Sequence, residues 1–304
     1  MFNKVDERII DNLIEICGTN DVLIEEEELE RYSQDESGRF YAHMPEVVIR
    51  AENTEEISKV LKLANENLIP VTPRGAGSGV VGGAVPVYGG ILLSLEKMNQ
   101  ILEIDKVNLV AMAEPGVVTN DLCKKVAEEG LFYPGYPMSV ETSFLGGNVA
   151  TNAGGSKVIK YGNTGHHILG LEVVFPSGEV LPLGGKRRKD SSGYNLLNLM
   201  VGSEGTLGVF SKITVNLIPL PLYTVDLLVP FSTVESAIQT VPEVIRESKV
   251  LPCAVEFLDR LSVELASIYT KCRWEYQEQA EAYLLIQFDG NSKVQLEESY
   301  IRAG

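Results

Sequence analysis

Glycine is the feature that most restricts how this chain can fold, because its glycines are unevenly distributed. All but four of the 28 glycines lie between Gly75 and Gly208, in a chain of 304 residues. Glycine adopts positive φ and lets a backbone approach a neighbour or ligand closely, at a cost to regular helices and strands. The sequence therefore predicts a central region of close-approach loops between more regular segments.

The composition is that of a globular protein and excludes several classes of partner. Hydrophobic residues make up 44% and charged residues 22% of the chain, and the formal net charge is −16. That charge repels phosphate backbones, so nucleic acid is not expected, and no apolar run reaches membrane-spanning length. Four scattered cysteines fit a reducing compartment, and the charged N-terminus lacks a secretory signal. We expect a cytoplasmic protein, with peripheral membrane association left open.

Hydrophobic periodicity predicts both strands and helices. Residues 47–49 read as a buried strand, Asn53 and Glu56 form a capping box for a helix reaching Leu68, and residues 69–72 form a second strand. This βαβ order predicts a parallel pairing. Further strands are expected at 91–95, 101–104, 109–113, 168–175, 179–183 and 209–217, with a helix at 119–129.

The C-terminal part of the chain has a different pattern. Pro219 and Pro221 mark a domain boundary, after which strands and helices alternate in an α/β, ferredoxin-like order. We expect an α+β protein with a first domain over 1–221, in subdomains of about 1–105 and 106–221. Residues 222–304 form a second, apparently incomplete domain.

One glycine motif invites a misleading interpretation. Residues 77–82 satisfy the G-x-G-x-x-G pattern of a Rossmann dinucleotide site, whose chemistry requires a helix to start at the loop. The glycine pairs and Pro86 that follow disfavour such a helix, which argues against an NAD-binding Rossmann protein. Arg74 beside free backbone amides still predicts an anion site.

Two further glycine-rich segments extend this site. Residues 145–155 combine four glycines with two asparagines, which suits a backbone lying against a flat ligand, and residues 202–208 lead directly into a strand. Three separated glycine elements predict one long ligand of dinucleotide size.

Taken in order, these motifs resemble the FAD-binding domain of the vanillyl-alcohol oxidase type, also called PCMH-type. The resemblance covers residues 30–221 and is nearest to the branch of glycolate oxidase large subunits and D-lactate dehydrogenase flavoproteins. Its motifs are residues 73–79, 146–150, 152–155, 160–162, 169–174, 193–194 and 202–208.

The resemblance implies bound FAD between two α+β subdomains, followed by a cap domain. The FAD-contacting residues that it implies are Pro73, Arg74, Gly75, Ala76, Gly77, Ser78, Gly79, Gly82, Pro137, Met138, Ser139, Gly146, Gly147, Asn148, Asn152, Gly154, Gly155, Tyr161, Gly162, Glu204, Gly205, Gly208 and Val209.

Three departures from the family pattern matter. Ser78 stands where some members attach FAD through a histidine, so we expect non-covalent FAD. Tyr136 replaces an acidic residue that relatives carry before the second glycine cluster. Residues 222–304 contain no histidine, whereas family members bind metal through histidines in this part, so we expect no metal site here. A divalent metal would require residues beyond Gly304.

The resemblance implies an FAD-dependent dehydrogenase or oxidase that acts on the CH–OH group of a small D-2-hydroxy acid, such as lactate or glycolate. Oxidation also requires a base, for which His166 and His167 are weak candidates, alongside cofactor-contacting or structural roles. Electrons would pass to a protein or quinone acceptor, and a homodimer is left open. The alternatives are a non-catalytic or truncated FAD-binding module, and another flavin reaction such as alkyl-glycerone-phosphate-synthase-like chemistry.

Overall fold

The computed structural model describes residues 2–274 and 276–303, and its contacts divide the chain into two compact units. The first comprises Met1–Ala153 and Asn163–Ile218, and the second comprises Gly154–Gly162 and Pro219–Gly304. Loop Gly154–Gly162 thus belongs to the second unit although residues of the first unit flank it on both sides. Neither hydrophobic periodicity nor glycine content indicated that residues 154–162 belong to the second unit.

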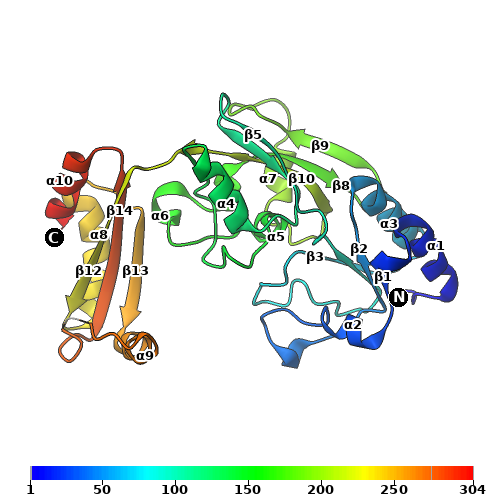
Figure 1. Cartoon of the computed structure of the whole chain (residues 1–304), viewed down its shortest axis with the longest axis horizontal. Coiled ribbons are helices and arrows are strands. Elements are labelled where there is room, and N and C mark those ends of the chain that lie inside the picture. The colour runs from blue at the N-terminus through cyan, green and yellow to red at the C-terminus, as the bar shows by residue number, and fades with distance from the viewer. Residues whose placement is uncertain (1, 275, 304) are drawn as a thin grey trace. The chain divides into compact units, whose positions relative to one another are not determined.

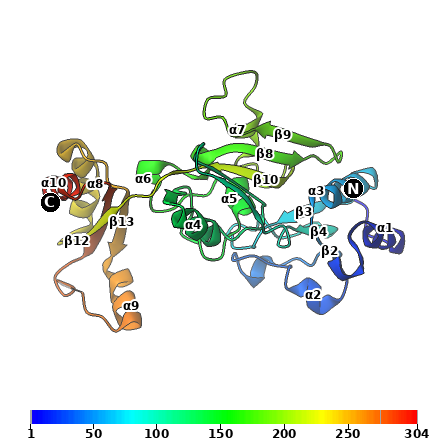
Figure 2. The same cartoon turned by 45° about the horizontal axis from the view of Figure 1, so that its top comes forward.

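The first unit begins with a four-stranded sheet. Its order is β1 (Val22–Leu23), β2 (Val47–Arg50), β4 (Ile91–Ser94) and β3 (Val71–Arg74). Both β2 and β3 run parallel to β4, which confirms the predicted parallel arrangement and places β4 between the two predicted partners. Helices α1 (Glu7–Cys17) and α3 (Thr54–Glu66) lie side by side on this sheet, as Figures 1 and 2 show. Short helices η1 (Thr19–Asp21), α2 (Glu26–Glu30) and η2 (Arg39–Tyr41) precede β2.

Helix α3 forms where the sequence places it, for two local reasons. The Asn53 side chain accepts a hydrogen bond from the Glu56 amide at 3.0 Å, and the Glu56 carboxylate accepts one from the Glu52 amide at 2.8 Å. These bonds satisfy amides at the helix N-terminus, which have no partner within the helix. The apolar face of the helix is buried in the hydrophobic core that it forms with α1, β2 and β4. Its buried residues are Ile57, Val60, Leu61 and Ala64.

A five-stranded antiparallel sheet forms the rest of the first unit. Its order is β5 (Ile101–Asp105), β6 (Val110–Ala113), β10 (Val209–Asn216), β8 (Ile168–Val174) and β9 (Val180–Gly184). Helices α4 (Thr119–Glu128) and α5 (Leu145–Thr151) bury their apolar residues in the core of this sheet. The shorter elements here are β7 (Leu131–Phe132), paired with β11 (Ile218–Pro219), together with η3 (Thr164–His167) and α7 (Leu196–Met200).

The second unit is a three-stranded antiparallel sheet with helices. The strand order is β12 (Tyr223–Phe231), β14 (Ala282–Gly290) and β13 (Ala254–Asp259). All three strands lie where the alternating pattern predicts strands. Helices α8 (Val234–Ser248) and α10 (Lys293–Ala303) pack on the sheet through a shared core (Figure 1). Helix α9 (Arg260–Thr270) and the short α6 (Val158–Tyr161) contact β13. Helices and sheets thus confirm the α+β fold class.

Candidate functional site

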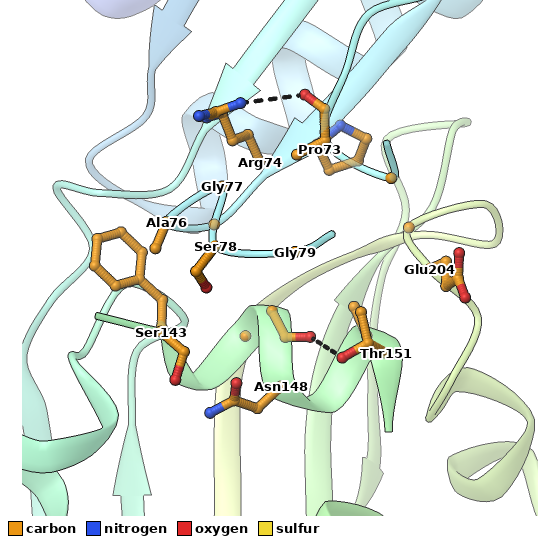
Figure 3. A pocket seen from close by; sticks show the side chains of 18 of the residues that line it. Pro73, Arg74, Ala76, Gly77, Ser78, Gly79, Ser143, Asn148, Thr151 and Glu204 are labelled. Carbon is orange, nitrogen blue, oxygen red and sulfur yellow. Dashed lines mark hydrogen bonds between the residues drawn. The ribbon is translucent and has the colours of Figure 1, made fainter. Parts of the chain in front are cut away.

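A cavity of about 190 Å³ in the first unit collects most of the predicted ligand-binding residues. Its walls come from the loop after β3, from helix α5 and from the loop before β10, and Figure 3 shows the first of these facing the helix. The lining includes Pro73, Arg74, Gly75, Ala76, Gly77, Ser78, Gly79, Pro137, Ser139, Gly146, Gly147, Asn148, Glu204, Gly205, Gly208 and Val209. The three glycine-rich segments therefore meet at one place.

Helix α5 is held beneath this cavity by buried polar contacts. The Asn148 amide nitrogen donates to Thr119 Oγ1 at 2.6 Å, and that hydroxyl donates to the Ser143 carbonyl at 3.0 Å. The Glu204 amide donates to the Ala150 carbonyl at 2.8 Å, which ties the loop before β10 to the same helix. Glu204 has a φ of +52°, a backbone conformation that is strained for a residue with a side chain.

Two adjacent glycines of α5 serve different purposes. A Cβ on Gly146 would lie 2.6 Å from Pro115 Cβ, so this glycine allows the helix to pack against the chain before α4. A Cβ on Gly147 would meet no protein atom within 4 Å, and Gly147 lines the cavity. Gly147 therefore keeps open a surface that the protein itself does not fill.

Arg74, which the sequence suggests as an anion-binding cation, also anchors the first loop. Its Nη1 donates to the Gln34 carbonyl at 2.8 Å and to the Ala84 carbonyl at 3.4 Å. Gly77 has a φ of +72°, and a Cβ there would collide with the guanidinium. Burial lowers the pKa of Arg74, against the opposing charge of Asp35. The Arg74 guanidinium, which the sequence suggests for anion binding, thus already donates hydrogen bonds to backbone carbonyls of the protein.

A second cavity, of about 440 Å³, adjoins the first. The two share Pro73, Gly83, Glu204, Gly205, Gly208 and Val209, and the second also reaches Gly82. The two cavities therefore adjoin along one wall.

Seven of the predicted FAD-contacting residues do not line the first cavity. Gly82 lines only the second cavity, and the Met138 side chain is 71% exposed outside both. Asn152 lies at the end of α5 in a left-handed conformation, and its side chain accepts a hydrogen bond from the Gly165 amide at 2.8 Å. The remaining four lie in loop Gly154–Gly162 of the second unit: Gly154, Gly155, Tyr161 and Gly162.

Loop Gly154–Gly162 is held by one buried carboxylate on β14. The Asp289 side chain is 1% exposed, and it accepts hydrogen bonds from Lys160 Nζ and, at 2.9 Å, from the Tyr161 hydroxyl. Lys157 Nζ lies 3.6 Å from the same carboxylate and also donates to Gln287. Burial alone would raise the pKa of Asp289, but the bonds and charges of these partners outweigh it and lower the pKa.

Neither histidine proposed as a base lines either cavity. His167 is buried in η3 and its ring meets Tyr133 edge to face, with centroids 6.1 Å apart. The His166 ring nitrogen Nδ1 lies 2.6 Å from Asn163 Oδ1 on the exposed side. Among the described residues, no three side chains of His, Cys, Asp or Glu converge as metal ligands.

Several cavity residues escaped the sequence analysis. Ser143, Phe144 and Thr151 are close in sequence to predicted residues, so extending the glycine motif by a few positions would have found them. Asp35 also lines the cavity, but it precedes β2 and belongs to no glycine motif.

Comparison with solved structures identifies the fold as that of PCMH-type flavoproteins. The chain superimposes on alkyldihydroxyacetonephosphate synthase with a TM-score of 0.85 and 21% identity, covering 99% of this chain and 59% of that one. It matches p-cresol methylhydroxylase with a TM-score of 0.77 and 20% identity, covering 96% of this chain and 62% of that one. At these identities the likeness concerns the fold alone.

Two family models give the assignment. Residues 45–184 match the FAD binding domain and residues 220–301 match the C-terminal domain of FAD linked oxidases. The chain is 43% identical over 302 residues to a D-lactate dehydrogenase of Anaerostipes hadrus, covering 98% of this chain and 63% of the relative. It is 42% identical over 259 residues to glycolate oxidase subunit GlcD of Bacillus subtilis, covering 85% and 54%. The chain belongs to the family of FAD-linked oxidases.

The cofactor of this family is FAD, and the cavity suits it. An open face at Gly147, two adjoining cavities and loops built from glycine leave room for a flat ligand. The chain spans 54% to 63% of the length of these two curated relatives. Among the described residues, no helix combines the length and the apolar character needed to cross a bilayer.

Proposed function

We propose that this chain takes part in the FAD-dependent oxidation of a small D-2-hydroxy acid of the lactate or glycolate type. The observation that carries the proposal is the cavity between Gly75–Gly79 and α5, in a chain 43% identical to a D-lactate dehydrogenase. When bound, FAD supplies the acceptor for the hydride that leaves the α-carbon.

The protein's own contribution begins with holding the cofactor. The backbone of loop 75–79, the open face of α5 at Gly147 and the loop of Glu204 would bind and orient the ligand, and Arg74 would fix the first loop. Ser78 lies in that loop (Figure 3), and a serine hydroxyl offers no histidine-type attachment, so we propose that FAD is held non-covalently. Leu95 and Phe210 add apolar walls that exclude water.

Among the described residues, no histidine lines this cavity to serve as the base of the reaction. His166 and His167 lie outside it, and the carboxylates that line it are Asp35 and Glu204. This observation favours a second candidate, an FAD-binding module whose base and substrate-binding cation come from elsewhere.

An anaerobic titration distinguishes the two candidates. The purified 304-residue chain is loaded with FAD, and D-lactate or glycolate is added while flavin absorbance is recorded, with L-lactate as the matched control. We expect bleaching with a D-2-hydroxy acid and none with L-lactate. Tight binding of FAD without bleaching by any 2-hydroxy acid would favour the module, and bleaching by a different substrate class would favour another flavin reaction.

We propose a protein or quinone as the electron acceptor, and a cytoplasmic location from the scattered cysteines. The basic run 186–189 is a weak docking candidate because its charges are partly engaged within the chain. Lys186 Nζ lies 2.6 Å from Glu103 Oε1, and Arg187 Nη2 lies 2.8 Å from Asp190 Oδ2. Whether the chain forms a homodimer would be tested by analytical ultracentrifugation.

A further inference from the structure

Three buried oxygen atoms without partners lie within four consecutive residues beside the cavity. Gln34 Oε1, Asp35 Oδ2 and Ser37 Oγ are all inaccessible and have no hydrogen-bond partner among the residues described. Buried polar atoms in folded proteins nearly always have a partner, because leaving one unsatisfied forfeits its hydrogen bond to water without replacement. A cluster of three therefore calls for an explanation.

This segment is built onto the first glycine loop. The Glu36 amide donates to the Gly79 carbonyl at 2.9 Å, and the Gln34 carbonyl receives Arg74 Nη1 at 2.8 Å. Asp35 is only 7% exposed and lines the same cavity as Gly75–Gly79. The position of a Cβ on Gly79 would be 3.9 Å from Asp35 Oδ2.

The two carboxylate oxygens of Asp35 differ in their surroundings. Oδ1 accepts a hydrogen bond from the Ser37 amide at 2.9 Å, which forms an Asx turn. Oδ2 has no such donor, and in the part of the chain that the structure describes no ion pair joins Asp35 to a cation within 4 Å. Oδ1 thus stabilises the turn, whereas Oδ2 has no hydrogen-bond donor among the described residues.

We propose that Asp35 Oδ2 accepts a hydrogen bond from a hydroxyl or amino group of the bound FAD. An ionised carboxylate can only accept hydrogen bonds and repels phosphate, so its partner is a donor that flanks the pyrophosphate and not the pyrophosphate itself. FAD offers ribityl and ribose hydroxyls and the adenine amino group. The proposal rests on FAD being the cofactor and needs no particular substrate.

The test is Asp35→Asn, with the dissociation constant of FAD measured by quenching of flavin fluorescence. Asparagine keeps the acceptor of the Asx turn but replaces the charged acceptor Oδ2 by an amide nitrogen, so the charge-assisted bond from an FAD hydroxyl or amino group is lost. Loss of a hydrogen bond to a charged group predicts FAD binding about 10-fold to 100-fold weaker. The matched control is Asp6→Asn, because Asp6 also accepts a local amide, from Ile9 at 2.9 Å, but does not line the cavity.

The thermal midpoint of the FAD-free protein must stay close to that of wild type, which separates a binding defect from misfolding. If Asp35→Asn does not fold, Asp35→Ser takes its place, since serine can also accept the Ser37 amide. A rise in dissociation constant of about fivefold or more supports the proposal, and a smaller rise or tighter binding overturns it. Failure of wild type to bind FAD would instead overturn the cofactor assignment.

The same variant locates the donor. ADP carries the adenosine and both phosphates of FAD, and FMN carries the flavin, the ribityl chain and one phosphate. Both are tested as competitors of FAD on wild type and on Asp35→Asn. Selective loss of affinity for ADP places the donor in the adenosine half, and selective loss for FMN places it in the ribityl–flavin half.

Discussion

Loops Gly75–Gly79 and Gly154–Gly162 are both rich in glycine, both match family motifs, and both were predicted to contact FAD, yet the structure treats them differently. The first follows β3, lines the cavity and is anchored by Arg74 to backbone carbonyls. The second belongs to the other compact unit, where side-chain charges tie it to Asp289 on β14.

This difference separates two meanings of glycine in one sequence. At the first loop, the open space lies over Gly147 of α5, where a Cβ would meet no protein atom within 4 Å. Gly75 of the loop lies close to it, since a Cβ built on Gly75 would be 3.6 Å from the Gly147 backbone. In the second, Gly162 adopts a φ of +82° at the end of α6, and the preceding Lys160 and Tyr161 donate hydrogen bonds to the Asp289 carboxylate. Glycine density marks both loops, but the hydrogen-bond partners distinguish a ligand site from a structural anchor.

The largest effect is expected from Asp289→Ala, which removes the anchor of the second loop. Two lysines would lose a buried counter-charge, and loss of one partner of a buried ion pair costs about 3 kcal/mol. Trp274, the only tryptophan of the chain, packs on Tyr283 in the second unit, so its fluorescence during urea unfolding reports on that unit. Asp226→Asn is the matched control, because Asp226 is an exposed carboxylate on the same sheet and asparagine keeps the oxygen that accepts from Gln287 Nε2.

The same carboxylate predicts a pH dependence. The pKa of Asp289 is lowered in the folded protein, so its stabilisation is fully present above the unfolded-state value of about 4. It is lost as pH falls through the folded-state pKa. Wild type should therefore lose stability of the second unit below about pH 4 more steeply than Asp289→Ala. Parallel acid profiles for the two proteins would contradict this role.

An intermediate effect is expected from Gly147→Ala at the first loop's cavity. The new methyl group would enter space that the protein leaves open, so we expect FAD to bind at least about 10-fold more weakly. The free energy of unfolding of the FAD-free protein should stay unchanged or rise by about 0.5–1 kcal/mol, because alanine favours the helix more than glycine does. Flavin fluorescence and urea unfolding measure the two quantities.

Gly146→Ala, at the adjacent position, should change the stability of the FAD-free protein in the opposite direction. Its methyl group would collide with Pro115, so stability should fall by about 1–3 kcal/mol even without FAD. Unchanged FAD affinity in Gly147→Ala would place the ligand away from this face of α5.

Regular elements were predictable because their signals are local. The capping box of Asn53 and Glu56 set the start of α3, and alternation of strand and helix gave the order of the second unit. Helix α5 was not predicted, since Gly146 and Gly147 disfavour helix. It is stabilised by tertiary bonds instead, including the Gly146 amide to the Pro115 carbonyl at 2.8 Å.

The site was predictable only in part, for the same reason. Glycine motifs located the cavity-lining residues Gly75–Gly79 and Gly147, because the pattern is carried by these positions themselves. They could not locate Asp35, which reaches the cavity through contacts with Gly79 and Arg74. Nor could they reveal that Tyr161 bonds a carboxylate 128 residues away, since no local pattern encodes such a pairing.

The smallest effect, and the sharpest test of the comparison, is expected from Tyr161→Phe. The family motif assigns Tyr161 to FAD, whereas its hydroxyl donates to Asp289. Phenylalanine keeps the ring and removes one hydrogen bond, so we expect the second unit to lose about 1 kcal/mol in tryptophan-monitored unfolding. The affinity for FAD should stay within about twofold of wild type, because no cavity wall changes.

Tyr223→Phe, which removes a half-exposed hydroxyl from β12 in the same unit, should leave both quantities unchanged. If Tyr161→Phe instead weakened FAD binding about tenfold while unfolding stayed as in wild type, the second loop would serve the cofactor as the first does. The distinction between ligand site and structural anchor would then fail at Tyr161, and Asp289 would act by positioning that hydroxyl for FAD.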